Sequence, residues 1–138
     1  MTQQLLVKEA MSHDNYTLLA SASVEEAAAA MQKHQLPGAP VVNERQELVG
    51  FVSEHDVLRQ LLESSYHSTS KALVQDVMKT EVMTVKPDDS IIELAQTMSQ
   101  IDKPKLYPVV SHGKVEGIIT RGMLLKALIK NRAEVSRV

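Results

Sequence analysis

The residue types that catalyse reactions or hold metals are scarce in this chain, and their spacing supports little chemistry. No cysteine is present, which excludes thiol nucleophiles, disulfides and cysteine-based metal sites. The five histidines show no H-x-x-x-H or related spacing, so we expect no metal site. The adjacent carboxylates Glu25 and Glu26, and likewise Asp88 and Asp89, precede or open a predicted helix, where negative charge suits the helix dipole. Motifs of hydrolases, phosphate-binding loops and dinucleotide folds are missing. We therefore expect no catalytic residue and no catalytic cofactor.

The most informative polar pair is Ser53 and Asp56, in the run Gly-Phe-Val-Ser-Glu-His-Asp that begins at Gly50. On the residues alone, this pair is a capping-box-like helix start. Such a cap stabilises a helix by about 0.5–2 kcal/mol with no ligand present. A helix cap therefore stays open as the alternative to any binding role of these two side chains.

The elements that position this pair occur twice, because the second half of the chain repeats the first. Methionine, threonine, serine and glycine positions recur 67 residues later: Met11 and Met78, Thr17 and Thr84, Ser23 and Ser90, Met31 and Met98, Gly50 and Gly117. The Pro-Val-Val run at Pro40 recurs at Pro108, 68 residues later. One-residue length changes of this kind belong in loops.

Each copy predicts the same series of elements. A short helical start (6–11, 74–78) leads to a short strand (17–19, 82–85) and then to Ser-x-x-Glu, a capping box, at Ser23 and Ser90. Behind each box the apolar residues follow helical spacing: Val24, Ala27, Ala28 and Met31, then Ile91, Leu94, Ala95 and Met98. Two strands with a short polar link follow (40–43 with 48–53, 107–111 with 115–120), which favours a hairpin.

A final helix ends each copy, with apolar residues Val57, Leu58, Leu61 and Leu62, then Leu124, Leu125, Leu128 and Ile129. The predicted fold class is α/β of the α+β type, with two β-α-β-β-α repeats packed as a pseudo-two-fold pair. We expect the repeats at residues 6–62 and 73–130, a serine-rich linker at 63–72 and a C-terminal tail at 131–138. A unit of about 60 residues is marginal alone, which favours one module of two repeats.

Composition limits the function further. The chain has 138 residues, 43% of them apolar, and a net charge of −2, which argues against nucleic acid as a partner. No apolar run reaches the roughly 18–20 residues of a membrane helix, and the N-terminus does not look like a secretory signal. We expect a cytoplasmic protein with no membrane partner.

The doubled pattern resembles the CBS domain, a family named after cystathionine β-synthase that typically occurs as a tandem pair. The resemblance covers residues 6–129. It rests on VKEAMS, SVEEAAAAM, APVVN and LVGFVSEHDVLRQL in copy one, and on VQDVMK, SIIELAQTM, YPVVS and VEGIITRGMLLKAL in copy two. The family implies a non-enzymatic regulatory module that binds an adenosine-type ligand (AMP, ADP, ATP or S-adenosylmethionine, sometimes NAD) in clefts between the two repeats.

Copy one keeps the family motif Gly-h-h-Ser/Thr-x-x-Asp, where h is an apolar residue. The resemblance implies that the Asp56 carboxylate accepts ribose hydroxyls and that Ser53 assists with ribose or phosphate at a helix start, which suits anions. It further implies a base pocket lined by Thr17, Leu36, Pro37, Ala39 and Pro40. His55 lies inside the motif, either near the ligand or as an exposed residue of the helix start.

Copy two departs from the motif, because Met123 stands where the aspartate belongs. Methionine cannot accept two ribose hydrogen bonds, so we expect one competent site and one degenerate site. The candidate residues of the degenerate site are Thr84, Lys105, Tyr107, Pro108, Thr120 and Arg121. With Lys103, the cations Lys105 and Arg121 attract phosphate or form a solvated face. Thr17 and Thr84 have the alternative of being strand-favouring residues.

Two further classes remain as alternatives. The first is a scaffold for partners or dimerisation with unoccupied nucleotide sites, which the methionine at position 123 favours. The second is an enzyme, which the lack of any catalytic constellation disfavours. The resemblance also implies a homodimer formed through helices, and a regulated protein that the sequence does not identify.

Overall fold

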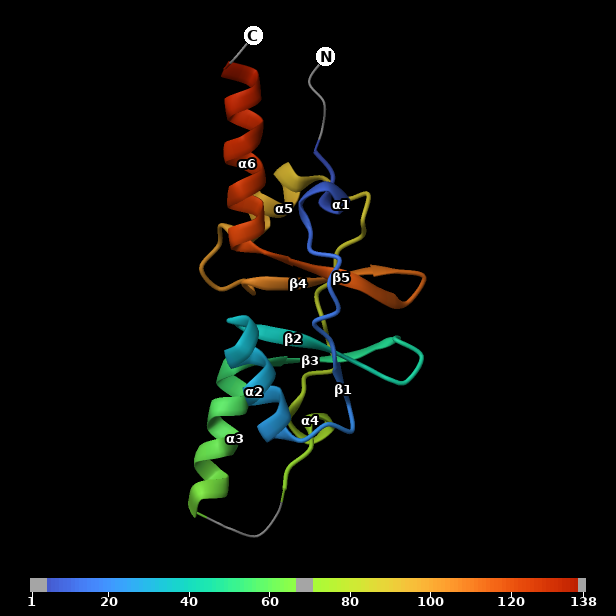
Figure 1. The fold of residues 1–138 in the computed structure, drawn as a ribbon, viewed down its shortest axis with the longest axis vertical. Helices are drawn as coiled ribbons and strands as arrows, with labels where there is room; N and C mark the ends of the chain where they lie inside the picture. Colours follow the sequence, from blue (N-terminus) through green and yellow to red (C-terminus); the bar gives the residue numbers. More distant parts are fainter. Residues whose placement is uncertain (1–4, 67–70, 137–138) are drawn as a thin grey trace. The chain divides into compact units, whose positions relative to one another are not determined.

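The computed structural model describes residues 5–66 and 71–136. Within them the chain forms six helices and five strands in two sheets (Figure 1). The order is α1 (Val7–Ala10), β1 (Leu18–Leu19), α2 (Val24–His34), β2 (Gly38–Val42), β3 (Leu48–Ser53), α3 (Glu54–Tyr66), α4 (Val74–Val77), α5 (Ile91–Met98), β4 (Leu106–Ser111), β5 (Lys114–Thr120) and α6 (Arg121–Ser136). The predicted mixed α/β fold class is confirmed.

The two helices with predicted capping boxes begin where the sequence places them. Ser23 Oγ accepts a hydrogen bond from the Glu26 amide at 3.0 Å, and Ser90 Oγ accepts one from the Glu93 amide at 3.4 Å. The predicted apolar stripes are buried along both helices: Val24, Ala27 and Met31 on α2, then Ile91, Leu94 and Met98 on α5. Capping and helical periodicity thus determine both elements locally.

The β1–β3 sheet confirms the predicted hairpin of the first copy. β2 and β3 are antiparallel, with Gly38 opposite Ser53, and β1 joins β2 in parallel, with Leu18 opposite Val41. β2 is buried along its whole length. Its first residue therefore brings the end of β3, where α3 begins, beside the chain that leaves α2.

The second copy has a shorter counterpart of β1. Only Val85 pairs with the sheet: its amide donates to the Pro108 carbonyl at 3.1 Å, and its carbonyl accepts from the Val110 amide at 2.8 Å. The next amide, Lys86, is already occupied by Asp89 Oδ2 at 2.8 Å. This local turn ends the pairing after one residue, so the strand expected at 82–85 is a single bridge. β4 and β5 form the second sheet and are joined through His112 and Gly113, both at positive φ (54° and 78°).

The compact units of the structure are not the sequence repeats. Unit A holds residues 16–83 and 112–115, and unit B holds residues up to 15, 84–111 and those from 116 onward. The short helix α4, which follows the serine-rich stretch, therefore lies in unit A, where it contacts α3 and β3. In the same way α1 lies in unit B, where it contacts α6. Each unit is completed by the segment that opens the other repeat.

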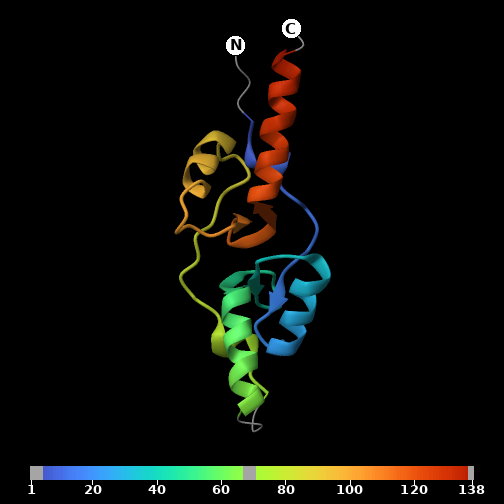
Figure 2. The same ribbon diagram turned by 90° about the vertical axis from the view of Figure 1, so that its left-hand side faces the viewer.

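Each unit has its own apolar core. In unit A, α2 and α3 lie side by side (Figure 2), and Val74 of α4 is fully buried among the residues of α2, β2 and β3. In unit B, Val7 of α1 is fully buried with residues of α5, β4, β5 and α6. The exchanged helices therefore contribute to the hydrophobic stabilisation of the units that they join.

The final helices run further than the sequence analysis expects. α3 continues to Tyr66, so residues 63–66 of the expected linker are helical, while residues 67–70 lie outside the described part. α6 continues to Ser136 through most of the expected tail. Glutamate, arginine and alanine in these stretches are favourable in helices, which explains the extension.

The exchanged segments cross the strands at two glycines. Phe51 of β3 and Lys79 exchange two backbone hydrogen bonds of 2.8 Å, and a Cβ at Gly50 would lie 2.9 Å from the Lys79 carbonyl oxygen and 2.5 Å from Met78 Sδ. In unit B, Ser12 and Ile118 make the equivalent pair beside Gly117, where a Cβ would collide with the Ser12 carbonyl. Only glycine gives the backbone room to pass.

We therefore predict that Gly50→Ala lowers the free energy of unfolding by about 1–3 kcal/mol, because overpacking would displace the Met78–Lys79 backbone. The matched control is Gly122→Ala in α6, where the nearest atom to a new Cβ, Thr120 Oγ1, is 3.7 Å away. It should raise the free energy of unfolding by about 0.5–1 kcal/mol, the usual preference for alanine in a helix. Urea unfolding followed by circular dichroism measures both, and equal effects would contradict the crossing.

Candidate functional site

The start of α3 joins Ser53 and Asp56 by three hydrogen bonds. Asp56 Oδ2 accepts from the Ser53 amide at 3.1 Å and from the Ser53 hydroxyl at 2.9 Å. Ser53 Oγ in turn accepts from the Asp56 amide at 3.1 Å. The predicted cap is therefore formed, and it fixes the orientation of the Asp56 carboxylate.

The cap leaves part of this carboxylate available for a ligand. Both side chains are half-buried, and within the described residues Asp56 Oδ1 makes no hydrogen bond. A carboxylate oxygen accepts up to two hydrogen bonds, so Oδ1 can receive a pair of neighbouring hydroxyl groups. The free amides of the first turn of α3 add the positive end of the helix dipole, which favours an anionic group nearby.

The structure brings the expected base-pocket stretch to this helix start. The Glu54 amide donates to the Pro37 carbonyl at 2.9 Å, and Ser53 pairs with Gly38 in the sheet. Leu36 and Pro37 are half-buried before β2, whereas Ala39 and Pro40 are buried within it. The backbone of this stretch thus lies beside the capped serine.

Thr17 and His55 are not brought to the carboxylate in the same way. Thr17 precedes the edge strand β1, on the far side of β2 from β3, and its hydroxyl accepts a hydrogen bond of 3.4 Å from the Gln46 side chain. His55 is exposed, and its Nε2 lies 2.8 Å from the Arg59 guanidinium, which donates to it. Their assignment to the site stays a prediction.

The sequence analysis missed the segment at Met78 and Lys79 as a neighbour of this site. Lys79 pairs with Phe51, two residues before Ser53. The signal in the sequence is the shared 67-residue spacing of Met11 with Met78 and of Gly50 with Gly117. That spacing does not reveal which copy the segment joins.

The equivalent helix start in unit B keeps the cap and lacks the carboxylate. Thr120 Oγ1 accepts a hydrogen bond from the Met123 amide at 3.2 Å. The side chain of Met123 is half-buried and offers only a weak thioether acceptor. The start of α6 therefore has the backbone geometry of α3 without its acceptor for hydroxyl groups.

The remaining residues of the expected degenerate site are dispersed in their exposure. The Lys105 carbonyl accepts from the Arg121 amide at 3.2 Å, and both side chains are exposed, as is Thr84. Pro108 is buried in β4. No ion pair or hydrogen bond joins the cationic side chains in the described residues, so a phosphate role for them stays a prediction.

Tyr107 is a buried phenol without a partner. Its side chain lies in the core of unit B with 2% of its surface exposed, and its hydroxyl makes no hydrogen bond. Burial, and secondarily the negative charge of Asp102, raise the pKa of Tyr107 above its usual value of 10.0. The first copy has the small Ala39 at the corresponding position.

Two searches of the described residues found no further site. No group of three histidine, aspartate or glutamate side chains there is placed to hold a metal ion. None of the described helices combines the length and the apolar character needed to cross a bilayer.

Comparison with known proteins identifies the repeated pattern. The family model described as CBS domain matches residues 7–63 and 74–130. The uncharacterised protein MJ1225 of Methanocaldococcus jannaschii is 31% identical over 122 residues, which are 88% of this chain and 42% of the relative. This chain thus spans less than half the length of that relative.

Two solved structures with bound ligands are similar to this chain. CBSX2 of Arabidopsis thaliana, in complex with AMP, is 25% identical with a TM-score of 0.77, over 92% of this chain and 98% of that one. The CBS domain pair of protein MJ0100, in complex with 5′-methylthioadenosine and S-adenosylmethionine, is 26% identical with a TM-score of 0.78. That match covers 93% of this chain and 98% of the other.

We predict that Tyr107→Phe keeps or raises the free energy of unfolding at pH 7, by up to about 1–2 kcal/mol, because it removes an unsatisfied buried hydroxyl. Since the folded-state pKa of Tyr107 is raised, the folded state holds this proton more tightly. The wild type should therefore lose stability relative to the variant as the pH rises above 10. Urea unfolding at pH 7 and at pH 10.5 tests both parts, and a loss of stability at pH 7 would contradict them.

Proposed function

The chain belongs to the CBS domain family, and from that membership we propose that it is a non-enzymatic regulatory module that binds an adenosine-type ligand at the Ser53–Asp56 helix start. The ligand classes are AMP, ADP, ATP and S-adenosylmethionine. The similar proteins CBSX2 and MJ0100 support this choice through their bound AMP, 5′-methylthioadenosine and S-adenosylmethionine.

The observation that carries the proposal is the half-free Asp56 carboxylate. Its Oδ2 is held by Ser53, and its Oδ1 faces no competing donor in the described residues. The two ribose hydroxyls donate to this oxygen. The base lies along the backbone of residues 36–40, which the bond between Glu54 and Pro37 holds against the helix start.

The proposed mechanism is a shift of conformational populations. A ligand stabilises the conformer that binds it better, by no more than its difference in affinity between conformers. An unidentified partner protein reads the favoured conformer. The cytoplasmic location and the absence of catalysis remain predictions from the sequence.

The scaffold alternative rests on one specific observation, the methionine at position 123. Thr120 caps α6 with no carboxylate nearby, so this helix start has no means of holding a ribose. In the scaffold hypothesis the Ser53–Asp56 pair is likewise only a cap.

We also propose that the module forms a homodimer through α3 and α6. Each helix exposes two apolar side chains one turn apart: Leu58 and Leu62 on α3 are 60% and 56% exposed, and Leu125 and Ile129 on α6 are each 61% exposed. The same positions in both copies thus carry apolar residues that no described residue covers.

We expect AMP or S-adenosylmethionine to raise the melting temperature of the wild type by several degrees. At about 100 times its dissociation constant, a ligand stabilises a protein by about 2.7 kcal/mol. Asp56→Ala should weaken the binding of that ligand at least about tenfold, as measured by calorimetry, because a carboxylate acceptor of hydroxyl groups contributes about 1.5–3 kcal/mol.

The matched control is Ser23→Ala, which removes a helix cap of the same unit far from Asp56 along the chain. Its stability should fall by about 0.5–2 kcal/mol with the affinity unchanged. If the two variants lose stability alike and no ligand binds the wild type, the scaffold hypothesis replaces the sensor.

For the dimer, we expect the double variant Leu58→Glu with Leu62→Glu to sediment as a monomer at micromolar concentrations where the wild type is dimeric. Two buried and unpaired carboxylates would cost more than the contact gains. Ile101→Glu serves as the control, since Ile101 is 99% exposed and lies on neither helix. A wild type that stays monomeric at every concentration would overturn the proposal.

A further inference from the structure

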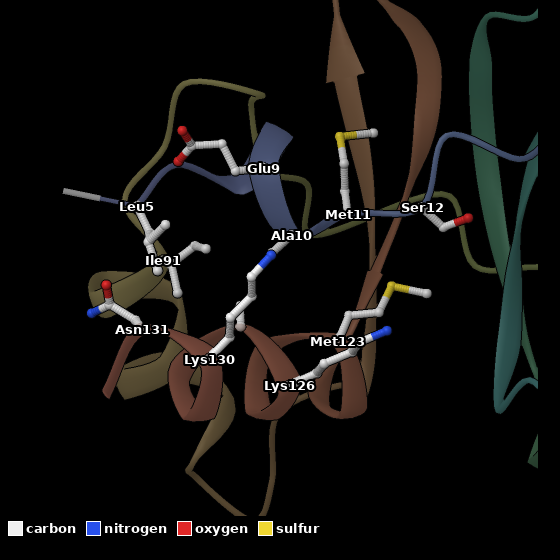
Figure 3. A pocket seen from close by; sticks show the side chains of 11 residues that line it. Leu5, Glu9, Ala10, Met11, Ser12, Ile91, Met123, Lys126, Lys130 and Asn131 are labelled. Atoms are coloured by element: carbon white, nitrogen blue, oxygen red, sulfur yellow. The ribbon is translucent and has the colours of Figure 1, made fainter. Parts of the chain in front are cut away.

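A groove of about 540 Å³ lies in unit B between α1 and α6 (Figure 3). Its volume is within the range of roughly 300–1,000 Å³ that is usual for small-molecule sites. Leu5, Ile91 and Ala127 form an apolar part, and Met11 with Met123 continues it. Methionine side chains adapt to the shape of a ligand, which suits a flexible or irregular apolar group.

Two cations border this groove. Lys126 and Lys130 lie one turn apart on α6, and Figure 3 shows both side chains reaching from that helix toward α1. Neither ammonium group has an ion pair or hydrogen bond within the described residues. Glu9 lies on the opposite border, but it points away from the lysines, and its Oε2 is occupied by the Leu6 amide at 2.8 Å.

The equivalent positions of unit A have a different chemistry on the same scaffold. Positions 56, 59, 60 and 63 precede Met123, Lys126, Ala127 and Lys130 by 67 residues, and they carry Asp, Arg, Gln and Glu. The cation among them, Arg59, already donates to His55 at 2.8 Å. Two acidic groups and an engaged arginine thus stand where unit B has a methionine, an alanine and two unneutralised lysines.

We propose that the groove of unit B binds a small amphiphilic anion, with its apolar body against Leu5, Ile91 and the two methionines and its anionic head between Lys126 and Lys130. This site differs in unit and in ligand chemistry from the adenosine site. The replacement of the acceptor at position 123 by methionine then serves a second specificity, since a carboxylate there would repel the bound anion. The proposal does not depend on the adenosine site being occupied.

The probe is decanoate, titrated by calorimetry below the concentration at which it forms micelles. Decanol supplies the apolar body without charge, and acetate supplies the carboxylate without the body. We expect decanoate to bind at least about tenfold more tightly than either, because each lacks one of the two contributions. Equal binding of decanol and decanoate would overturn the role of the lysines, and binding of none of the three would overturn the site.

The double variant Lys126→Gln with Lys130→Gln should weaken decanoate binding by about tenfold, a modest factor because both lysines are exposed. The charge-matched control is Lys33→Gln with Lys114→Gln, which removes two exposed cations of unit A. It should leave decanoate binding unchanged. Equal losses in both double variants would show a non-specific charge effect and overturn the proposal.

Methyl-labelled methionine gives a readout of position. Decanoate should shift the NMR signals of Met11 and Met123, whereas Met78, the counterpart of Met11 in unit A, should not move. Met123→Asp should abolish decanoate binding. Shifts confined to Met78, or unchanged binding in Met123→Asp, would contradict the placement of the ligand.

Discussion

Two backbone crossings at glycine organise the rest of this structure. At Gly50 and Gly117 the segment that follows a short helix passes directly over a strand and exchanges hydrogen bonds with it. The crossings fix α4 on unit A and α1 on unit B, where Val74 and Val7 become fully buried. They also place the crossing segment within a few residues of the helix starts at Ser53 and Thr120. Fold and candidate site thus share one geometric constraint, and a side chain at either glycine would disturb both.

Local patterns in the sequence predicted the elements that depend on local interactions. The capping serines at positions 23 and 90, the buried stripes of α2 and α5 and the β2–β3 hairpin all lie where periodicity and capping place them. The exchange of α1 and α4 could not be predicted, because the two copies present nearly the same apolar faces, so either could accept either helix. The short pairing at Val85 escaped for a different reason: it depends on Asp89 capturing a single amide.

The candidate site was predictable only in its chemistry. Ser53 and Asp56 were identified by type and spacing, while the sequence could not show that one carboxylate oxygen is held by the cap and the other is not. Nor could it show that Thr17 lies beyond β2. The two helix starts now read as variants of one scaffold. The start of α3 presents an acceptor for hydroxyl groups, and the start of α6 presents a methionine beside an apolar groove with lysines at its border.

The central claim is that Asp56 serves a ligand as well as its helix. A crystal structure of the chain grown with AMP tests it most directly. The account predicts a ribose whose hydroxyls lie within hydrogen-bond distance of Asp56 Oδ1 while Oδ2 stays on Ser53, with the base along residues 36–40. A nucleotide bound elsewhere, or crystals at saturating AMP in which this helix start carries no ligand, would contradict it.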